Sequence, residues 1–131
     1  MMRVAYVDSS VVVAVMSHEP NAEAMRERLK AFDKLFSGSL LEAEVRSAGR
    51  RKGVLARHVE ACLAPVHLVL PHRSLKVEIE QVLGAGYLPG PDLWHVACAI
   101  YLGQALTRAA FVTLDEKQSE VAAKAGLDVV G

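Results

Sequence analysis

The sequence predicts an α/β fold: a single three-layer α/β/α sandwich over residues 1–131 with a central, mostly parallel sheet. Short apolar runs rich in β-branched residues alternate with longer segments whose apolar side chains recur at helical spacing. The 131 residues suffice for one domain with one core, and 52% of them are hydrophobic. A parallel sheet covered by helices on both faces accounts for that apolar content.

The first half of the chain alternates strand and helix after a short apolar run that ends in Asp8. Val4-Ala5-Tyr6-Val7 contains β-branched residues, which favours a strand over 3–8 that is buried on both faces. His18-Glu19-Pro20-Asn21 breaks the helix that follows, and Gly53 ends a later one. Helices are predicted over residues 9–16, 21–32 and 39–52, with a strand at 34–38.

The second half repeats the alternation, with proline and glycine at the boundaries. The segment from Asp92 to about Leu106 is apolar nearly all round, which is typical of a buried helix. Pro91 disfavours helical backbone at Gly90, so this helix is predicted to begin at Asp92. Other helices are predicted from about 55 to 63, 75 to 83 and 118 to 125, and strands at 67–70, 111–114 and 127–130.

Charge and cysteine content limit the classes of function. The 15 basic and 15 acidic residues balance, so nucleic-acid binding would have to use a local basic patch. Cys62 and Cys98 lie in apolar sequence without metal-ligand spacing, which predicts buried free thiols and fits a reducing cytoplasm. No run approaches the roughly 18 apolar residues of a membrane span, so we expect a cytoplasmic protein without membrane contact.

Three aspartates stand where a parallel sheet builds its sites. Asp8 and Asp115 follow predicted strands, and Asp92 opens the buried helix. Ligands in open α/β sheets bind outside the carboxyl ends of the strands, so these side chains can converge at one edge. Each aspartate could instead simply cap the helix after it, and Asp115 with Gln118 fits a capping box.

A fourth carboxylate breaks the apolar stripe of the helix predicted over 39–52. Glu44 occupies a position of that stripe, and an inward-pointing carboxylate is costly unless a cation meets it. A salt bridge or an outward tilt of Glu44 would explain it without chemistry. Glu42 falls on another face, one turn before Arg46, and fits an ordinary surface ion pair.

Four converging carboxylates would repel one another, and some would take up protons instead of staying charged. A hard divalent cation with oxygen ligands, Mg²⁺ or Mn²⁺, resolves that repulsion. Histidines and cysteines are not spaced for a zinc site. Magnesium held by carboxylates usually acts on phosphates, so the pattern points to phosphoryl chemistry.

The order of these motifs resembles that of the PIN domain, and in particular the single-domain VapC-type toxin ribonucleases. The resemblance covers essentially the whole chain, and its third stretch looks like the family's D-x-x-H-x-A-x-A helix. The four stretches are Tyr6-Val7-Asp8-Ser9-Ser10, then Glu44-Val45-Arg46-Ser47-Ala48 followed by Arg50-Arg51, then Asp92-Leu93-Trp94-His95-Val96-Ala97-Cys98-Ala99, and last Phe111-Val112-Thr113-Leu114-Asp115.

The resemblance implies a Mg²⁺- or Mn²⁺-dependent endoribonuclease that cleaves single-stranded RNA by in-line attack of metal-activated water. The four acids match the metal-binding and catalytic positions, Thr113 and Ser9 match hydroxyls that position water or a carboxylate, and His95 matches a position with a more often structural role. The metal and catalytic positions are Asp8, Glu44, Asp92 and Asp115, with Thr113 as a further catalytic position.

The resemblance also implies partners. Such proteins are commonly homodimers and act as toxins of type II toxin–antitoxin pairs. A cognate antitoxin lays a segment over the acidic pocket, often with an arginine that reaches the carboxylates.

One basic cluster begins just after Glu44 and could contact RNA phosphates. An ordinary solvated helix surface would look the same in sequence. The cluster consists of Arg46, Arg50, Arg51, Lys52 and Arg57.

Two other functions compete with the nuclease. A metal-dependent phosphatase or phosphotransfer receiver also uses strand-end aspartates with Mg²⁺, but these proteins carry a second early acid, and here Ser9-Ser10 follows Asp8. A non-catalytic PIN-like binding module would have no need of intact acids at all four positions.

Overall fold

The computed structural model describes residues 2–106 and 108–130, and its centre is a five-stranded sheet in the order β3-β2-β1-β4-β5. Every neighbouring pair of strands is parallel, which confirms the predicted parallel sheet. The strands are β1 (Val4–Val7), β2 (Lys34–Gly38), β3 (Val66–Val69), β4 (Ala109–Val112) and β5 (Asp128–Val130).

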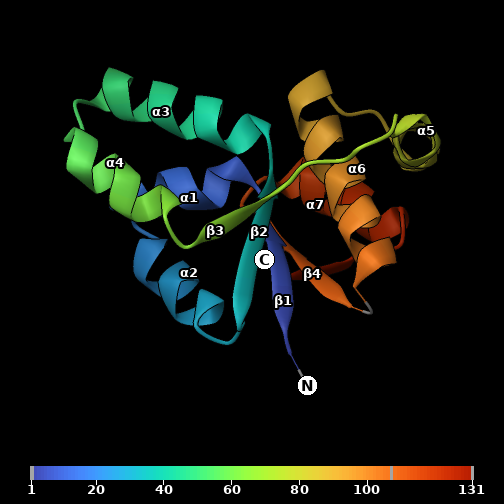
Figure 1. Ribbon diagram of the computed structural model, residues 1–131, viewed down its shortest axis with the longest axis horizontal. Coiled ribbons are helices and arrows are strands. Elements are labelled where there is room, and N and C mark those ends of the chain that lie inside the picture. Colours follow the sequence, from blue (N-terminus) through green and yellow to red (C-terminus); the bar gives the residue numbers. More distant parts are fainter. Residues whose placement is uncertain (1, 107, 131) are drawn as a thin grey trace.

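Helices cover both faces of the sheet, as predicted for a three-layer sandwich. Figure 1 shows α1 to α4 on one side and α5 to α7 on the other. The helices are α1 (Ser9–Met16), α2 (Ala22–Leu29), α3 (Leu40–Lys52), α4 (Ala56–Leu63), α5 (Lys76–Ala85), α6 (Gly90–Ala105) and α7 (Glu116–Lys124). None of the helices in the described part of the chain combines the length and apolar character that crossing a membrane requires.

β1 lies at the centre of the sheet and is buried along its whole length. Its side chains alternate between the two cores: Ala5 and Val7 pack under α1 and α3, whereas Tyr6 packs under α6. The backbone N–H of Asp8 donates to the carbonyl of Val112 at 2.9 Å, which ties the end of β1 to the end of β4. Residues that follow these strands therefore emerge side by side at one edge.

Several predicted boundaries are wrong by two or three residues: α2 ends at Leu29 instead of residue 32, and α7 begins at Glu116 instead of residue 118. Two others are wrong for identifiable reasons. α6 begins at Gly90 instead of Asp92, because the backbone nitrogens of a first helical turn lack intrahelical acceptors and Pro91 loses no hydrogen bond there. β4 ends at Val112 instead of residue 114, where its partner β1 also ends. Thr113 and Leu114 form the connection to α7.

α6 is the buried helix that its apolar sequence predicts. Its buried residues face the core shared with β1 and β4, and they include one polar side chain, His95. The buried residues are His95, Val96, Ala97, Cys98, Ala99 and Leu102.

α5 carries a buried carboxylate that the sequence reading did not single out. Glu78 is 1% exposed and accepts hydrogen bonds from both terminal nitrogens of Arg73, at 3.1 and 2.7 Å. Gln104 of α6 donates a further bond at 3.0 Å, so this group joins α5 to α6. The Arg73 guanidinium, with smaller contributions from the backbone N–H of Glu78 itself and from Gln104, outweighs the effect of burial and lowers the pKa of Glu78 to about 2.

This carboxylate predicts a pH-dependent part of the stability. A lowered folded-state pKa stabilises the protein above the ordinary value of 4.5, and that contribution is lost as the pH falls from 4.5 toward 2. We expect Glu78→Gln to lower the free energy of unfolding by about 1–3 kcal/mol at pH 7 and by roughly half that amount at pH 3, which lies partway through the loss. Urea unfolding at both pH values measures the difference. The exposed Glu80 on the same helix provides the control variant Glu80→Gln; an equal Glu78→Gln effect at pH 7 and pH 3 would contradict the linkage.

Candidate active site

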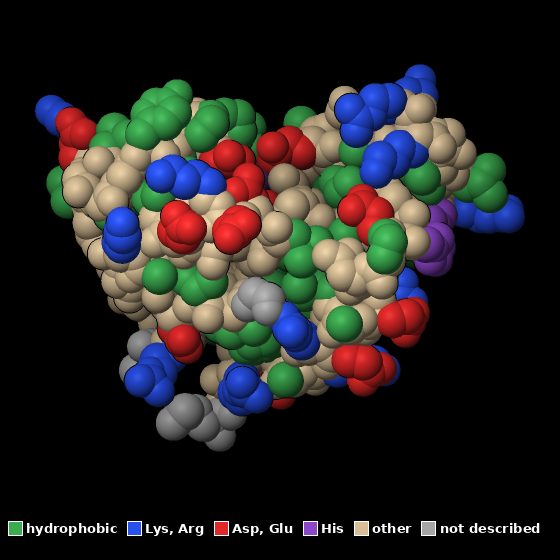
Figure 2. Space-filling view, turned by 180° about the vertical axis from the view of Figure 1, so that it is seen from behind, with side chains coloured by type: hydrophobic (Ala, Val, Ile, Leu, Met, Phe, Trp, Pro, Cys, Tyr) green, Lys and Arg blue, Asp and Glu red, His purple; other side chains and the backbone are tan. Residues whose placement is uncertain are grey.

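Four carboxylates from four separate elements lie toward the carboxyl edge of the sheet. Asp8 follows β1, Glu44 is on α3, Asp92 is in the first turn of α6, and Asp115 precedes α7. Figure 2 shows acidic side chains gathered around the notch in the upper edge of the molecule. The parallel topology brings residues 8 and 115 together although more than a hundred positions separate them.

Asp8 both caps a helix and belongs to this cluster. Its side chain is buried, and its Oδ2 accepts from the backbone nitrogen of Ser10 at 3.1 Å, as an N-cap does. Its Oδ1 accepts from the side-chain amide of Gln118 at 3.2 Å. The capping interpretation is therefore correct for Asp8, and it fixes the carboxylate at the sheet edge.

Glu44 is held by a histidine and not by a cationic lysine or arginine. His95 is fully buried, and its Nε2 lies 2.7 Å from Glu44 Oε1 and 3.8 Å from Asp8 Oδ1. Its Nδ1 lies 2.8 Å from the hydroxyl of Tyr6. Burial raises the pKa of Tyr6 well above its usual value, so this hydroxyl keeps its proton and can donate to Nδ1. That arrangement leaves the Nε2 proton for Glu44.

Glu42 lies on a different face of α3. Its carboxylate is half exposed and pairs with Arg46 at 3.0 Å, the i,i+4 contact that the sequence predicts. Arg46 also pairs with Glu60 of α4. The side chain of Glu44, in contrast, is 33% exposed and points to the buried imidazole of His95.

The pKa of Asp92 is raised, and the other three acids contribute to the shift. Partial burial is the first cause that raises its pKa, and the negative charges of Asp8 and Asp115, and more weakly of Glu44, add to it. Its backbone carbonyl accepts from the Gln118 amide at 3.2 Å. Asp92 therefore carries the electrostatic signature of carboxylates crowded at one edge.

Thr113 and Asp115 form the turn between β4 and α7. The buried hydroxyl of Thr113 accepts from the backbone nitrogen of Asp115 at 3.0 Å and donates to Gln118 Oε1 at 2.6 Å. Asp115 is exposed, and its Oδ1 accepts from the Gln118 backbone nitrogen at 2.9 Å, which caps α7. Half of the predicted capping box is present, because the Gln118 side chain turns to Asp8 instead of returning to Asp115.

The serine hydroxyl in this network belongs to Ser10, although the sequence reading placed Ser9 there. Ser10 Oγ accepts from the backbone nitrogen of Leu114 at 3.1 Å and lies 3.4 Å from Thr113 Oγ1. Sequence reasoning also missed Tyr6 and Gln118 as parts of the site. Gln118 stands on the buried stripe of α7, so the rule that singled out Glu44 could have found it.

The donor chemistry at this edge fits a hard divalent cation. The converging groups are carboxylates and a threonine hydroxyl, all oxygen donors of the kind that Mg²⁺ and Mn²⁺ prefer. Within residues 2–106 and 108–130, no group of three or more His, Cys, Asp or Glu side chains is arranged so that it could hold a metal ion. These residues are therefore of the right chemical type to bind a cation, although their side chains are not arranged around a common point.

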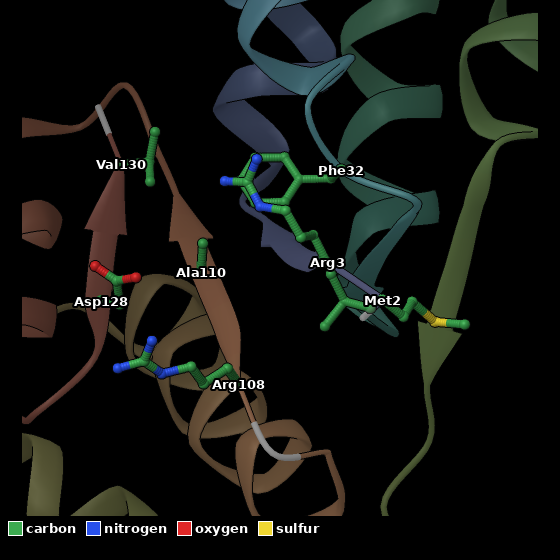
Figure 3. A pocket seen from close by; sticks show the side chains of 8 residues that line it. Met2, Arg3, Phe32, Arg108, Ala110, Asp128 and Val130 are labelled. Carbon is green, nitrogen blue, oxygen red and sulfur yellow. The ribbon is translucent and has the colours of Figure 1, made fainter.

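Hollows on the surface border this edge. One of about 470 Å³ runs along α3, lined by Ala43, Glu44, Ser47, Ala48 and Arg51. Another of about 400 Å³ lies beside Thr113 and Asp115. The cavity in Figure 3, about 260 Å³, lies at the start of β1 and β4 instead, where Arg3 lies over the ring of Phe32; none of the four acids lines it.

Comparison with known proteins places this architecture in a family. The family model described as PIN domain matches residues 5–124. The chain is 33% identical to ribonuclease VapC46 of Mycobacterium tuberculosis over 98% of both chains. It also superposes on a chain from the 2.2 Å structure of VapBC-1 from nontypeable Haemophilus influenzae, with a TM-score of 0.70, 16% identity, and coverage of 97% of this chain and 96% of that one. With its parallel sheet and its carboxylates at the sheet edge, this chain belongs to the PIN domain family.

Proposed function

We propose that this protein is a metal-dependent endoribonuclease that cleaves single-stranded RNA and acts as the toxin of a type II toxin–antitoxin pair. The observation that carries the proposal is the convergence of acids at the sheet edge, where His95 Nε2 lies 2.7 Å from Glu44 and 3.8 Å from Asp8. Burial, and then the charges of Asp8, Asp115 and Glu44, raise the pKa of Asp92 beside them. The similarity to a ribonuclease over nearly the whole chain supports the same activity.

The four carboxylates would hold Mg²⁺ or Mn²⁺. When bound, such an ion polarises a phosphoryl oxygen and lowers the pKa of a coordinated water. The protein's own contribution is to hold the carboxylates in position. His95 fixes Glu44. The Ser10 nitrogen and the Gln118 amide fix Asp8, and these two donors carry no charge that would cancel the charge of the carboxylate.

Thr113 has a positioning role in this proposal. Its hydroxyl proton is directed to Gln118 at 2.6 Å, while its oxygen accepts from the Asp115 nitrogen. Because both its proton and its oxygen are used in these hydrogen bonds, the hydroxyl holds the Asp115 turn and the Gln118 amide. It is not arranged to take a proton from water.

Four residues of the basic cluster lie on α3, and one of them is placed beside the acids. Arg46 pairs with two glutamates, and Lys52 lies 3.4 Å from Glu19. Arg51 lines the same hollow of α3 as Glu44, whereas Arg50 lines another hollow with Val54 and Val59. Arg51 is therefore the side chain best placed to contact an RNA phosphate next to the carboxylates.

Two partners complete the proposal. A cognate antitoxin would cover the acidic edge, where a cationic side chain could pair with the carboxylates. Homodimer formation remains a prediction of the family resemblance. Exposed apolar side chains on and beside α5 are available for such a contact: Leu70, Val77, Leu83 and Tyr87.

Substitution of the acids tests the catalytic assignment. Because Asp8 is fixed on both oxygens at the centre of the network, Asp8→Asn should lower cleavage of a single-stranded RNA with Mn²⁺ by at least about 100-fold. Glu44→Gln should lower it strongly as well. Glu42→Gln, two residues away on another face, should stay close to wild type.

Fluorogenic RNA cleavage with Mn²⁺, with and without EDTA, measures these rates. Equal losses for Glu42→Gln and Glu44→Gln would overturn the assignment on α3. Hydrolysis of a small phosphomonoester in place of RNA would favour the phosphatase.

Substitution of the arginines tests the RNA contact. Arg51→Ala should weaken binding of single-stranded RNA and reduce the slope of log affinity against log salt by about 0.7, the value for one lost phosphate contact. Arg50→Ala removes the same charge from a different hollow and should change both quantities less. Fluorescence anisotropy of the inactive Asp8→Asn background, over a series of salt concentrations, gives both values. Identical curves for the two variants would show that charge on α3 acts without regard to position.

A further inference from the structure

Gln118 stands at the centre of the buried polar network, and its bond to Asp8 is only one of its three contacts there. Its side chain is fully buried under β1, β4 and α6. It contacts three elements of the site at once: Asp8 after β1, the backbone of Asp92 in α6, and Thr113 after β4. A buried amide on a helix stripe is costly unless each of its polar atoms finds a partner.

The orientation of this amide is determined by two partners that can only accept, the Asp8 carboxylate and the Asp92 carbonyl, and the Thr113 hydroxyl is compatible with it. The Thr113 oxygen accepts from the Asp115 nitrogen, so its own proton is free to point at Gln118 Oε1, 2.6 Å away. Gln118 Oε1 is therefore the acceptor, and the amide nitrogen faces the other way. That nitrogen has two protons, and its two acceptors are Asp8 Oδ1 and the Asp92 carbonyl, each at 3.2 Å.

Each donor and acceptor of the side chain is thus used. One proton holds a carboxylate oxygen of Asp8, and the other holds the first turn of α6, which carries the carboxylate of Asp92. The amide supplies this link without positive charge, so it orients Asp8 without neutralising it.

We propose that Gln118 is a positioning residue that sets the orientation of Asp8 and its spacing from Asp92 for a divalent cation. The inference rests on the proposed metal-dependent function and adds a residue to it. A leucine or methionine in its place fills similar space but leaves Asp8 Oδ1, the Asp92 carbonyl and the Thr113 hydroxyl without their partner. The Asp8 carboxylate and the helical turn that carries Asp92 would then no longer be linked through one side chain.

Calorimetric titration of the full-length protein with MnCl₂ tests the proposal without relying on activity. Gln118→Leu should weaken Mn²⁺ binding by about 10- to 100-fold, the range for lost partners of metal ligands. Gln118→Met, which is unbranched and equally unable to donate, should give the same result and serves if the leucine variant does not fold. Gln81→Leu is the matched control, because that exposed amide bonds a backbone carbonyl, that of Ala125, away from the acids.

Thermal unfolding of each variant separates folding from binding. Weaker Mn²⁺ binding by folded Gln118 variants, with Gln81→Leu unchanged, would support the assignment. Wild-type Mn²⁺ affinity in a folded Gln118 variant would overturn it and leave the nuclease proposal standing. Failure of the wild-type protein to bind Mn²⁺ would overturn both, whereas Mn²⁺ binding that depends on Gln118 in a protein inactive on RNA would reject only the nuclease.

Discussion

Repulsion among carboxylates at the edge of a parallel sheet is the constraint on which the rest of this structure depends. Parallel strands end together, so Asp8 and Asp115 are forced into proximity by topology, and α3 and α6 add Glu44 and Asp92. Burial, and then the charges of the other three acids, raise the pKa of Asp92. The fold keeps these acids in place with hydrogen bonds from the imidazole of His95, the amide of Gln118 and a backbone nitrogen.

The supporting residues lie in the same cores that hold the fold together. Tyr6 packs in the core between β1 and α6 and contacts His95 through its hydroxyl. α6 anchors the domain through its buried apolar face and at the same time presents His95 and the first-turn Asp92. The site is therefore built on rigid elements, as precise placement of charged ligands requires.

Much of this arrangement could be predicted from the sequence because it follows from local patterns. Apolar runs that end in Asp8 located the sheet edge, and the stripe of α3 separated Glu44 from Glu42. The predicted start of α6 at Asp92 is wrong because a proline disfavours helical backbone before it in general but is accepted in a first helical turn. The capping-box interpretation assigns Gln118 to Asp115 alone and so does not predict its contacts with Asp8 and the Asp92 backbone. The pairing of Arg46 with Glu60 joins α3 to α4, and no local pattern reveals such a contact.

A crystal structure grown with MnCl₂, with an anomalous difference map at a wavelength where manganese scatters, tests the central claim most directly. The account predicts a manganese peak at the carboxyl edge of the sheet with oxygens of Asp8 and at least one of Glu44, Asp92 and Asp115 as ligands. A strong peak bound elsewhere on the molecule, with this edge free of metal at saturating MnCl₂, would contradict it.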